Sequence, residues 1–304
     1  MVGECERFVP ELGRSKRELL GMGRAVEEAV GGMQVQLGVH RRTHVLYHTP
    51  AMGRSRLAET MRVRAFSTGR VRPKHGTRGV RRYLPGGWSD ETLPVNVFLI
   101  EHPAGLCLFD TGERAEAARR GYFPWWHPYF RLARFEAGEA DEAAPQLRAL
   151  GLDPQDVRWV VLSHLHTDHV GGLKGFAHAD VVVHAPEWNR ARGLGGRIRG
   201  YLPQRWPRGV SPRPVELDGP GVGPFACSHD LVADRSLLLV PLPGHTPDHV
   251  GLLVGAERPT HLLAGDAFED TAELERTAPA VAAFCRERGV AVLTTHGLGP
   301  DGRV

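Results

Sequence analysis

Cysteine is scarce in this chain, with 4 residues among 304. Cys5, Cys107, Cys227 and Cys285 are widely separated, and no two of them form a Cys-x-x-Cys pair. This spacing excludes a zinc knuckle and a dithiol redox motif. We therefore expect reduced thiols in a cytosolic protein. Cys107 and Cys285 stand in apolar runs, so we expect both in the core.

Long apolar segments are also missing. Charged residues are spread through residues 1–30, a pattern that does not fit a signal peptide. No later stretch offers the roughly 18 uninterrupted apolar residues that a membrane-spanning helix requires. The sequence therefore predicts a cytoplasmic protein with no membrane span.

The chain has no large excess of either charge. Its formal net charge is +3 at pH 7, which gives no general case for a nucleic-acid partner. Charge is nevertheless uneven, because residues 61–90 contain a basic cluster. A solvated face is the simplest explanation of that cluster, and an acidic substrate or an RNA backbone would also fit it. The cluster comprises Arg62, Arg64, Arg70, Arg72, Lys74, Arg78, Arg81 and Arg82, against Asp90.

The pattern divides the chain into two regions. Residues 1–60 lack sustained periodicity, so we expect a loosely structured N-terminal extension, and Met61 is a candidate for the biological start. Residues 61–304 are expected to form one domain, in which runs of strands with a few helices predict two packed sheets covered by helices. Strands are predicted at 95–100 and 106–109, as a hairpin, and at 157–163, 181–184, 237–242, 250–254, 261–263 and 290–294; helices are predicted at 142–150 and 272–288.

The segment 164–169, His-Leu-His-Thr-Asp-His, packs four potential metal ligands into six residues. An apolar strand pattern leads into it, so the ligands leave the carboxyl end of a strand, where open α/β sheets place ligand sites. Imidazole and carboxylate are good ligands for zinc and its neighbours. His164 and His166 can point the same way from an extended segment, whereas Asp168 and His169 follow where the chain must turn. An accidental solvated cluster is a poor explanation of this arrangement, and one peptide can supply two metals.

Three further potential ligands stand directly after predicted strands. They are His245, Asp266 and His296. Any one of them alone is weak evidence, because a histidine after a strand is more often a hydrogen-bonding or surface residue. Together with the segment 164–169 they make one coordinated metal site the economical explanation. An acidic residue, Asp110, also ends the predicted strand 106–109.

On these residues the chain resembles the metallo-β-lactamase superfamily. The motifs Phe-Asp-Thr-Gly at 109–112, His-Leu-His-Thr-Asp-His at 164–169 and Pro-Gly-His-Thr-Pro-Asp-His at 243–249 occur in the family's order, followed by Gly-Asp at 265–266 and Thr-His at 295–296. The resemblance runs from about Val63 to Gly297. It implies a layered α/β fold of the αββα type, in which two mixed sheets are flanked by helices and the metal site lies at one edge between them.

The resemblance also implies a role for each ligand. Asp110 would hold a ligand histidine through its other ring nitrogen. The cofactors would be two Zn²⁺ ions, and other divalent metals also fit. A bridging hydroxide would be the nucleophile of a hydrolase, with Asp168 and Asp266 as catalytic residues and Asp168 able to pass a proton to the leaving group. By resemblance, His164, His166 and His245 bind one zinc, Asp168, His169 and His296 bind the second, and Asp266 bridges them.

Within the superfamily the chain is most similar to the N-acyl homoserine lactonase-like branch, which implies hydrolysis of an ester or lactone of a small molecule. Two positions depart from that branch. Glu269 stands where those lactonases carry a tyrosine, and Asp248 stands where a glycine usually precedes the second histidine, His249, of the 243–249 motif. The aromatic segment 122–130 contains Trp125 and Trp126 and fits either a wall of the substrate pocket or a packing or dimer contact. Glu269, Trp125 and Trp126 are therefore the candidate pocket residues.

Other functions on the same fold stay open. The basic cluster favours a phosphodiesterase or RNA-processing enzyme, and a thioester hydrolase of the glyoxalase II kind is a further alternative. A non-catalytic scaffold would not need the complete ligand set. A diiron oxygen-reducing role does not fit, because such relatives have a carboxylate where this chain has His166. We expect a small-molecule substrate rather than nucleic acid, and a homodimer is compatible with the sequence.

Overall fold

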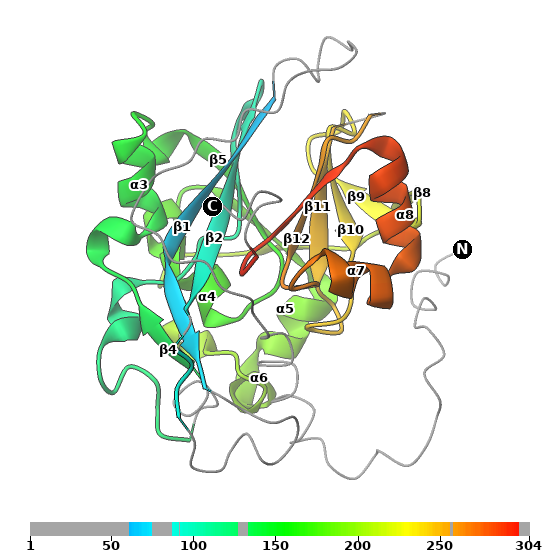
Figure 1. Cartoon of the computed structure of the whole chain (residues 1–304). Helices are drawn as coiled ribbons and strands as arrows, with labels where there is room; N and C mark the ends of the chain where they lie inside the picture. The colour runs from blue at the N-terminus through cyan, green and yellow to red at the C-terminus, as the bar shows by residue number, and fades with distance from the viewer. Residues whose placement is uncertain (1–60, 75–86, 91, 127–132, 256–257, 298–304) are drawn as a thin grey trace.

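The computed structural model describes residues 61–74, 87–90, 92–126, 133–255 and 258–297. Two β-sheets face each other, and helices lie on their outer sides (Figure 1). This is the predicted αββα arrangement. The predicted extension 1–60 lies outside the described residues, as do Arg78, Arg81 and Arg82 of the basic cluster.

Within the described residues, one sheet has seven strands and the other has six. The first sheet has the order β4-β1-β2-β3-β5-β6-β7 and is parallel from β3 to β7. The second has the order β13-β12-β11-β10-β9-β8 and is antiparallel except for the pair β12 and β13. The strands are β1 Arg62–Pro73, β2 Leu93–His102, β3 Gly105–Phe109, β4 Ala133–Glu136, β5 Val157–Leu162, β6 Asp180–His184, β7 Arg213–Val215, β8 Gly219–Val222, β9 Phe225–Asp230, β10 Leu237–Pro241, β11 Val250–Val254, β12 His261–Gly265 and β13 Ala291–Thr294.

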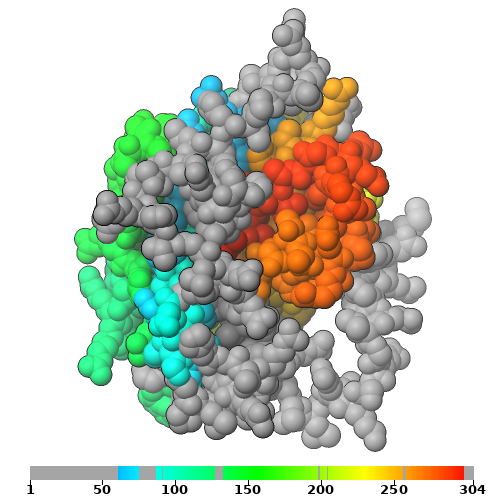
Figure 2. All heavy atoms as spheres, viewed as in Figure 1, coloured from blue at the N-terminus to red at the C-terminus, as the bar shows by residue number. Residues whose placement is uncertain are grey.

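The helices cover the outer faces of the two sheets. Helices α7 and α8 pack on the second sheet and form its outer surface, orange to red in Figure 2. Helix α3 packs against the outer face of the first sheet. Each helix in the described part of the chain is too short or too polar to cross a membrane. The α-helices are α3 Ala143–Ala149, α4 Thr167–Val170, α5 Ala185–Ala191, α6 Gly193–Ile198, α7 Thr271–Thr277 and α8 Pro279–Arg288.

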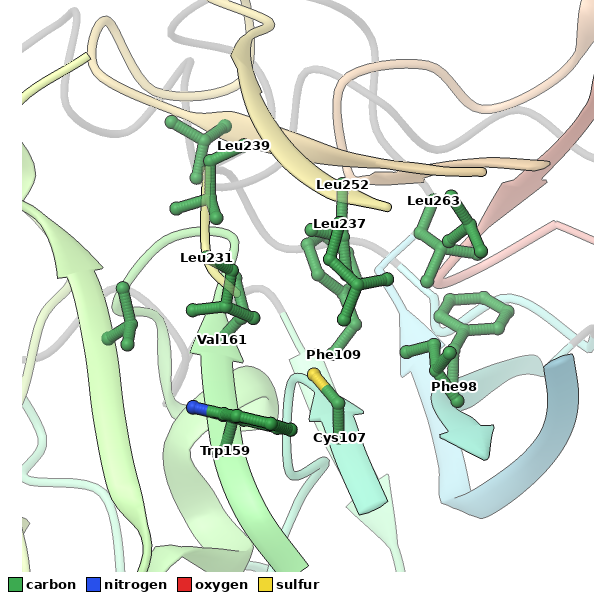
Figure 3. Packing of buried hydrophobic residues seen from close by; sticks show 14 of the residues in the cluster. Phe98, Cys107, Phe109, Trp159, Val161, Leu231, Leu237, Leu239, Leu252 and Leu263 are labelled. Carbon is green, nitrogen blue, oxygen red and sulfur yellow. The ribbon is translucent and has the colours of Figure 1, made fainter. Parts of the chain in front are cut away.

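The main core lies between the sheets. Strand side chains alternate between the two faces of a sheet, so Phe98 and Ile100 of β2 point inward while Val97 and Leu99 point toward the outer layer. Figure 3 shows the inner contact, where Phe109 and Val161 of the first sheet face leucines of the second. Because both faces of these strands are covered, their sequences are nearly continuous apolar runs.

Several predicted elements are confirmed. The hairpin forms from β2 and β3, which pair in antiparallel register from Phe98 opposite Phe109 to His102 opposite Gly105. The strands predicted at 157–163, 181–184, 237–242, 250–254, 261–263 and 290–294 correspond to β5, β6, β10, β11, β12 and β13. Strands β1, β4, β7, β8 and β9 were not predicted. All but β1 are short or lie toward the ends of their sheets.

The helix predicted at 272–288 is wrong as one element. It is divided into α7 and α8 at Ala278, whose φ of −137° and ψ of 60° are not helical. The reason is Pro279, because proline disfavours the helical conformation of the residue before it and has no N–H to donate. The predicted end of the helix at residue 288 is confirmed, since Gly289 caps α8 with a φ of 66°.

Two expectations about side chains have different outcomes. Cys107 and Cys285 are free and buried, as predicted, but Cys227 is disulfide-bonded, which contradicts the expectation of reduced thiols throughout. Within the basic cluster, Arg64 pairs with Glu101 at 2.6 Å and Arg72 pairs with Glu136 at 2.9 Å. These two arginines of β1 therefore form ion pairs with neighbouring strands at the surface of the first sheet.

Candidate metal centre

The segment 164–169 changes conformation in its middle. Strand β5 ends at Leu162, and the backbone stays extended to His166, whose φ is −69° and ψ is 160°. Helix α4 then begins at Thr167. His164 and His166 therefore leave an extended segment, whereas Asp168 and His169 lie on the first turn of a helix, as the spacing predicted. All four side chains are buried.

Asp110 fixes this segment from the neighbouring strand β3. Its Oδ1 accepts the backbone N–H of Ser163 at 2.8 Å, and its Oδ2 accepts the hydroxyl of Ser163 and Nδ1–H of His169, both at 2.8 Å. Asp110 has a φ of 64°, a conformation that costs a non-glycine residue free energy and that these bonds stabilise. The bond to Nδ1 leaves Nε2 of His169 to face the other ligands.

A close approach of two backbone segments explains the glycine at position 172, just after α4. A Cβ on Gly172 would lie 2.3 Å from the carbonyl oxygen of Thr111. The amide and hydroxyl of Thr111 both donate to the carbonyl of His169, at 2.8 and 2.9 Å. The turn after Asp110 and the turn after His169 are thus packed directly on each other, and only a residue without a side chain fits between them.

Three histidines form the first group of potential ligands. Nε2 of His164 lies 2.9 Å from Nδ1 of His166, which in turn lies 3.0 Å from Nε2 of His245. Burial lowers the pKa values of His164 and His166 well below their ordinary range and lowers that of His245. Neutral imidazoles with converging nitrogens are suited to bind a metal ion.

The second group joins acidic side chains to two histidines. Oδ2 of Asp168 lies 3.5 Å from Nε2 of His296, and Oδ1 of Asp168 lies 4.0 Å from Nε2 of His169. Oδ2 of Asp266 lies 3.3 Å from His169 and 3.5 Å from His296, and it also lies 3.4 Å from Nε2 of His245 in the first group. One oxygen of Asp266 therefore faces ligands of both groups.

The electrostatics of the second group favour positive charge. Burial alone would lower the pKa of His296, but the carboxylates of Asp266 and Asp168 outweigh it and raise that pKa to about 10. Burial also acts against protonation of His169, and there the carboxylates of Asp266 and Asp110 hold the pKa well above its usual range. A divalent cation supplies such positive charge.

Three buried polar atoms in this group have no hydrogen-bond partner. They are Oδ1 of Asp168, Nε2 of His169 and Oδ1 of Asp266. A buried polar atom without a partner costs about 1–3 kcal/mol and calls for an explanation. Together with the nitrogen and oxygen donors around them, these atoms fit the binding of a divalent metal ion.

Hydrogen bonds between the two sheets hold the ligands of the second sheet in position. The backbone N–H of Val250 donates to the carbonyl of Ser163 at 3.0 Å, and that of Asn96 donates to Thr295 at 2.9 Å. The side-chain amide of Asn96 donates to the carbonyl of Gly297 at 3.0 Å. Nδ1 of His296 donates to the carbonyl of Pro94 at 2.8 Å, so its Nε2 faces the other ligands.

His249 supports the backbone of Asp266. Its Nε2 accepts the amide N–H of Asp266 at 3.2 Å, and burial lowers its pKa to about 3, so the ring is neutral. It belongs to none of the ligand groups formed by the described residues. Gly265, which precedes Asp266, has a φ of 55°, and a Cβ there would lie 2.7 Å from Nε2 of His249.

Sequence reasoning missed several residues that hold the ligands in place. Ser163 and Asn96 form the contacts described above, and Glu187 of α5 joins two ligand-bearing loops through hydrogen bonds to Leu165 and Thr246. Asn96 is a polar residue within an apolar strand and Ser163 directly follows one, which is their only signal in the sequence, whereas Glu187 stands among other polar residues of α5. Their partners are distant along the chain, so spacing could not reveal them.

The candidate pocket residues are less well defined by the structure. Trp125 and Trp126 are exposed, by 71% and 45%, while the adjacent Phe123 is buried against Phe135. Residues 127–130 of the aromatic segment lie outside the described residues. Glu269 is partly buried in the loop between β12 and α7, and its backbone N–H donates to Glu273 at 2.8 Å. A role in the pocket stays a prediction for these three residues.

Known proteins are similar to this chain in sequence. N-acyl homoserine lactonase AttM from Agrobacterium fabrum is 33% identical over 178 residues, which cover 56% of this chain and 62% of that protein. The probable metallo-hydrolase Rv2300c from Mycobacterium tuberculosis is 35% identical over 187 residues, which cover 58% and 57%. The chain thus spans about three fifths of the length of these curated relatives.

Known structures are similar in fold, and a family model matches the chain. An N-acyl homoserine lactone hydrolase, solved with the product N-hexanoyl-L-homoserine at its catalytic metal centre, superimposes with a TM-score of 0.58 at 22% identity, over 77% of this chain and 92% of that one. The model of the metallo-beta-lactamase superfamily matches residues 90–297, more than half of the sequence. The fold, the order of the motifs and this match all agree, and the chain belongs to the metallo-β-lactamase superfamily.

Proposed function

We propose that this protein is a dinuclear zinc-dependent hydrolase that cleaves an ester or lactone of a small molecule. The observation that carries the proposal is the position of Asp266, whose Oδ2 lies within 3.5 Å of nitrogens from both ligand groups. A carboxylate in that position fits a bridge between two metals. Its Oδ1, which has no hydrogen-bond partner, would be available as a second ligand atom.

The side chains divide the work as follows. His164, His166 and His245 would hold one metal, while Asp168, His169 and His296 would hold the other, with Asp266 between them. When bound, such a metal pair supplies hydroxide at neutral pH and polarises the substrate carbonyl. Asp168 would hold a proton and pass it to the leaving alkoxide; its Oδ1, which has no hydrogen-bond partner, supports this role.

A lactone is the substrate class that the relatives favour. AttM and AiiB from Agrobacterium fabrum are both named N-acyl homoserine lactonases, and AiiB is 28% identical over 228 residues. Glu269 distinguishes this chain from that branch, because an ionised carboxylate cannot donate the hydrogen bond of a phenol. We therefore propose ester or lactone hydrolysis as the reaction class, with a substrate that does not rely on that donor.

The test combines metal analysis with a substrate series. We expect about two zinc ions per chain in protein expressed with zinc. His166→Ala and Asp266→Ala should abolish hydrolysis and leave the circular dichroism spectrum unchanged. His178→Ala, at an exposed histidine, should keep both the activity and the spectrum of the wild type. Acyl lactones, a thioester and bis-p-nitrophenyl phosphate are compared side by side. Activity on the phosphate diester alone, or protein free of metal, would overturn the proposal.

A further inference from the structure

Glu187 is a fully buried carboxyl on the first turn of α5. This helix follows β6 and lies near α4 at one end of the two sheets (Figure 1). Glu187 is in neither ligand group of the metal centre. Burying a carboxyl costs free energy unless its oxygens are well hydrogen-bonded, so its contacts require an explanation.

Both oxygens of Glu187 accept hydrogen bonds from loops that carry ligands. Oε1 accepts the backbone N–H of Leu165 at 3.2 Å, and Leu165 lies between His164 and His166 in the chain. Oε2 accepts the hydroxyl of Thr246 at 3.0 Å, and Thr246 directly follows His245. One carboxyl therefore connects a loop of the first sheet to a loop of the second.

Two further contacts extend this connection. Tyr201 also hydrogen-bonds to Glu187, and its ring packs against the ring of His166 with the centroids 5.0 Å apart. Burial raises the pKa of Glu187 to about 7, and the hydrogen bonds from Tyr201 and Thr246 oppose that rise. The carboxyl group of Glu187 thus accepts hydrogen bonds from three separate segments, through Leu165, Thr246 and Tyr201.

Two further residues, at the start of α5 and within it, bind the same loop of the second sheet. His184, just before α5, donates from Nδ1 to the carbonyl of Asp248 at 2.9 Å. Arg190 pairs with the carboxylate of Asp248 at 2.6 Å. Asp248 is the residue that replaces the usual glycine, so this chain has an ion pair at a position where that pair could not otherwise form.

We propose that Glu187 is a positioning residue that locks the His164–His166 loop to the His245 loop and so presents the three nitrogens of the first group together. This inference rests on the proposed function, since it concerns the same metal centre. Nδ1 of His166 lies within 3.0 Å of nitrogens of both His164 and His245, which opposes their lone pairs, and the bonds to Glu187 offset that cost. The second group has its own supports, because Asp110 holds His169 and Pro94 holds His296.

The decisive variant is Glu187→Gln. It keeps the shape of the side chain but turns one acceptor oxygen into an NH₂ group that faces a donor. We expect the affinity for the first metal to fall by about 10–100-fold, because residues that orient ligands have effects of this size. The second metal should be retained. The readouts are zinc content after dialysis, chelator competition, and the visible absorption spectrum of the Co²⁺-loaded protein, which reports the geometry of each site.

The matched control is Ser228→Ala. It removes a buried hydroxyl that donates to the carbonyl of Pro220 at 2.7 Å, between β8 and β9 and away from the ligands. We expect it to lower the melting temperature without changing metal affinity. Thr246→Val removes only one of the bonds to Glu187 and should weaken the first metal in the same direction, which keeps the test valid if Glu187→Gln does not fold.

Each result distinguishes this inference from the proposed function. If folded Glu187→Gln or Thr246→Val binds both metals with wild-type affinity, the inference is wrong and the proposed function stands. An equal loss of both metals would also contradict it, since only the first group is held by Glu187. If the wild-type protein binds no metal, the proposed function fails first.

Discussion

At the scale of single residues, Asp110 links the backbone to the metal centre. It adopts a φ of 64° and gives both of its oxygens to Ser163 and His169. The motif predicted that Asp110 would hold a ligand histidine, and the hydrogen bond to Nδ1 of His169 has the geometry that this role needs. Its bonds to Ser163, which connect β3 to β5, could not be read from the motif.

We expect Asp110→Asn to reduce the affinity for the second metal by about 10–100-fold. The neutral amide cannot accept from both Ser163 and His169 as the carboxylate does, so His169 loses its fixed orientation. Zinc content and chelator competition measure the effect. Asp153→Asn is the control, because Asp153 caps an exposed turn by accepting from the N–H of Gln155 at 2.9 Å. An unchanged metal affinity in Asp110→Asn would show that the hydrogen bond to His169 is dispensable.

His261, which lies outside the metal centre, should make the free energy of unfolding depend on pH. Burial lowers the pKa of His261 in β12 from 6.5 to about 4. Between these values the unfolded chain binds a proton that the folded chain does not, so acidification through this range lowers the free energy of unfolding. Because the ring is partly exposed, we expect a loss of about 1 kcal/mol near pH 5.

Urea unfolding of the wild type and of His261→Gln at a series of pH values isolates this contribution. Acid loss of metal affects both proteins, so it cancels in the difference between them. The variant should lose less stability than the wild type as the pH falls from about 6.5 to about 5. Parallel pH curves for the two proteins would contradict the prediction.

At the scale of elements, neighbouring residues and segments determine which helix or strand a hydrophobic pattern forms. The apolar residues Leu274, Val281 and Cys285 of the predicted helix 272–288 are all buried against the second sheet. Proline at 279 nevertheless divides these residues between two helices. In β13 the local pattern is weak, because the strand is short and only partly buried. His296, just after it, nevertheless lies among the other ligands. Its position depends on contacts with β2 of the other sheet.

Asn96→Leu tests those contacts. It removes the amide donors to Thr294 and Gly297, at 3.4 and 3.0 Å, and so releases the segment that carries His296. We expect a stability loss of about 1–3 kcal/mol. We also expect weaker binding of the second metal and faster hydrogen exchange at the amide of Thr295.

Gln146→Leu provides the matched control for that variant. It likewise removes two bonds from a buried amide, to the carbonyls of Ser67 and Asp141, both at 2.6 Å. A similar loss of stability with unchanged metal binding is expected there. If both variants weaken metal binding equally, the contact with β13 has no special role.

At the scale of the whole molecule, the two sheets share a core and one metal centre. The carboxylates and histidines at their common edge are buried or partly buried, with several atoms left without partners. A ligand that binds only the folded state stabilises it, by about 2.7 kcal/mol at a concentration of 100 times its dissociation constant. The metal centre should therefore contribute to the stability of the entire domain.

We expect removal of metal by a chelator to lower the melting temperature by at least about 5 °C, and added zinc to restore it. Differential scanning calorimetry measures the change. The double variant His166→Ala with Asp266→Ala should show no such response, because it lacks a ligand of the first group and the bridging carboxylate. A melting temperature that is indifferent to chelator in the wild type would contradict metal binding by the folded chain.

The sequence by itself determined the chemistry that this protein can present. The strands, their apolar faces and the ligands at their ends follow from local patterns, because side-chain alternation and turn residues act over a few positions. The division between His164 and His166 on an extended segment and Asp168 and His169 on a helix was also local. All seven candidate ligands were therefore recognisable before any contact was known.

Only the tertiary structure decided which of those ligands meet and what holds them. His245, Asp266 and His296 come from the second sheet, so their distances to His164 depend on how the two sheets pack. The supports, such as Asn96 and Glu187, pair with residues 22 to more than 190 positions away. Such pairs leave no periodic signal in one sequence, because a hydrogen bond across a fold depends on proximity in space rather than on spacing along the chain.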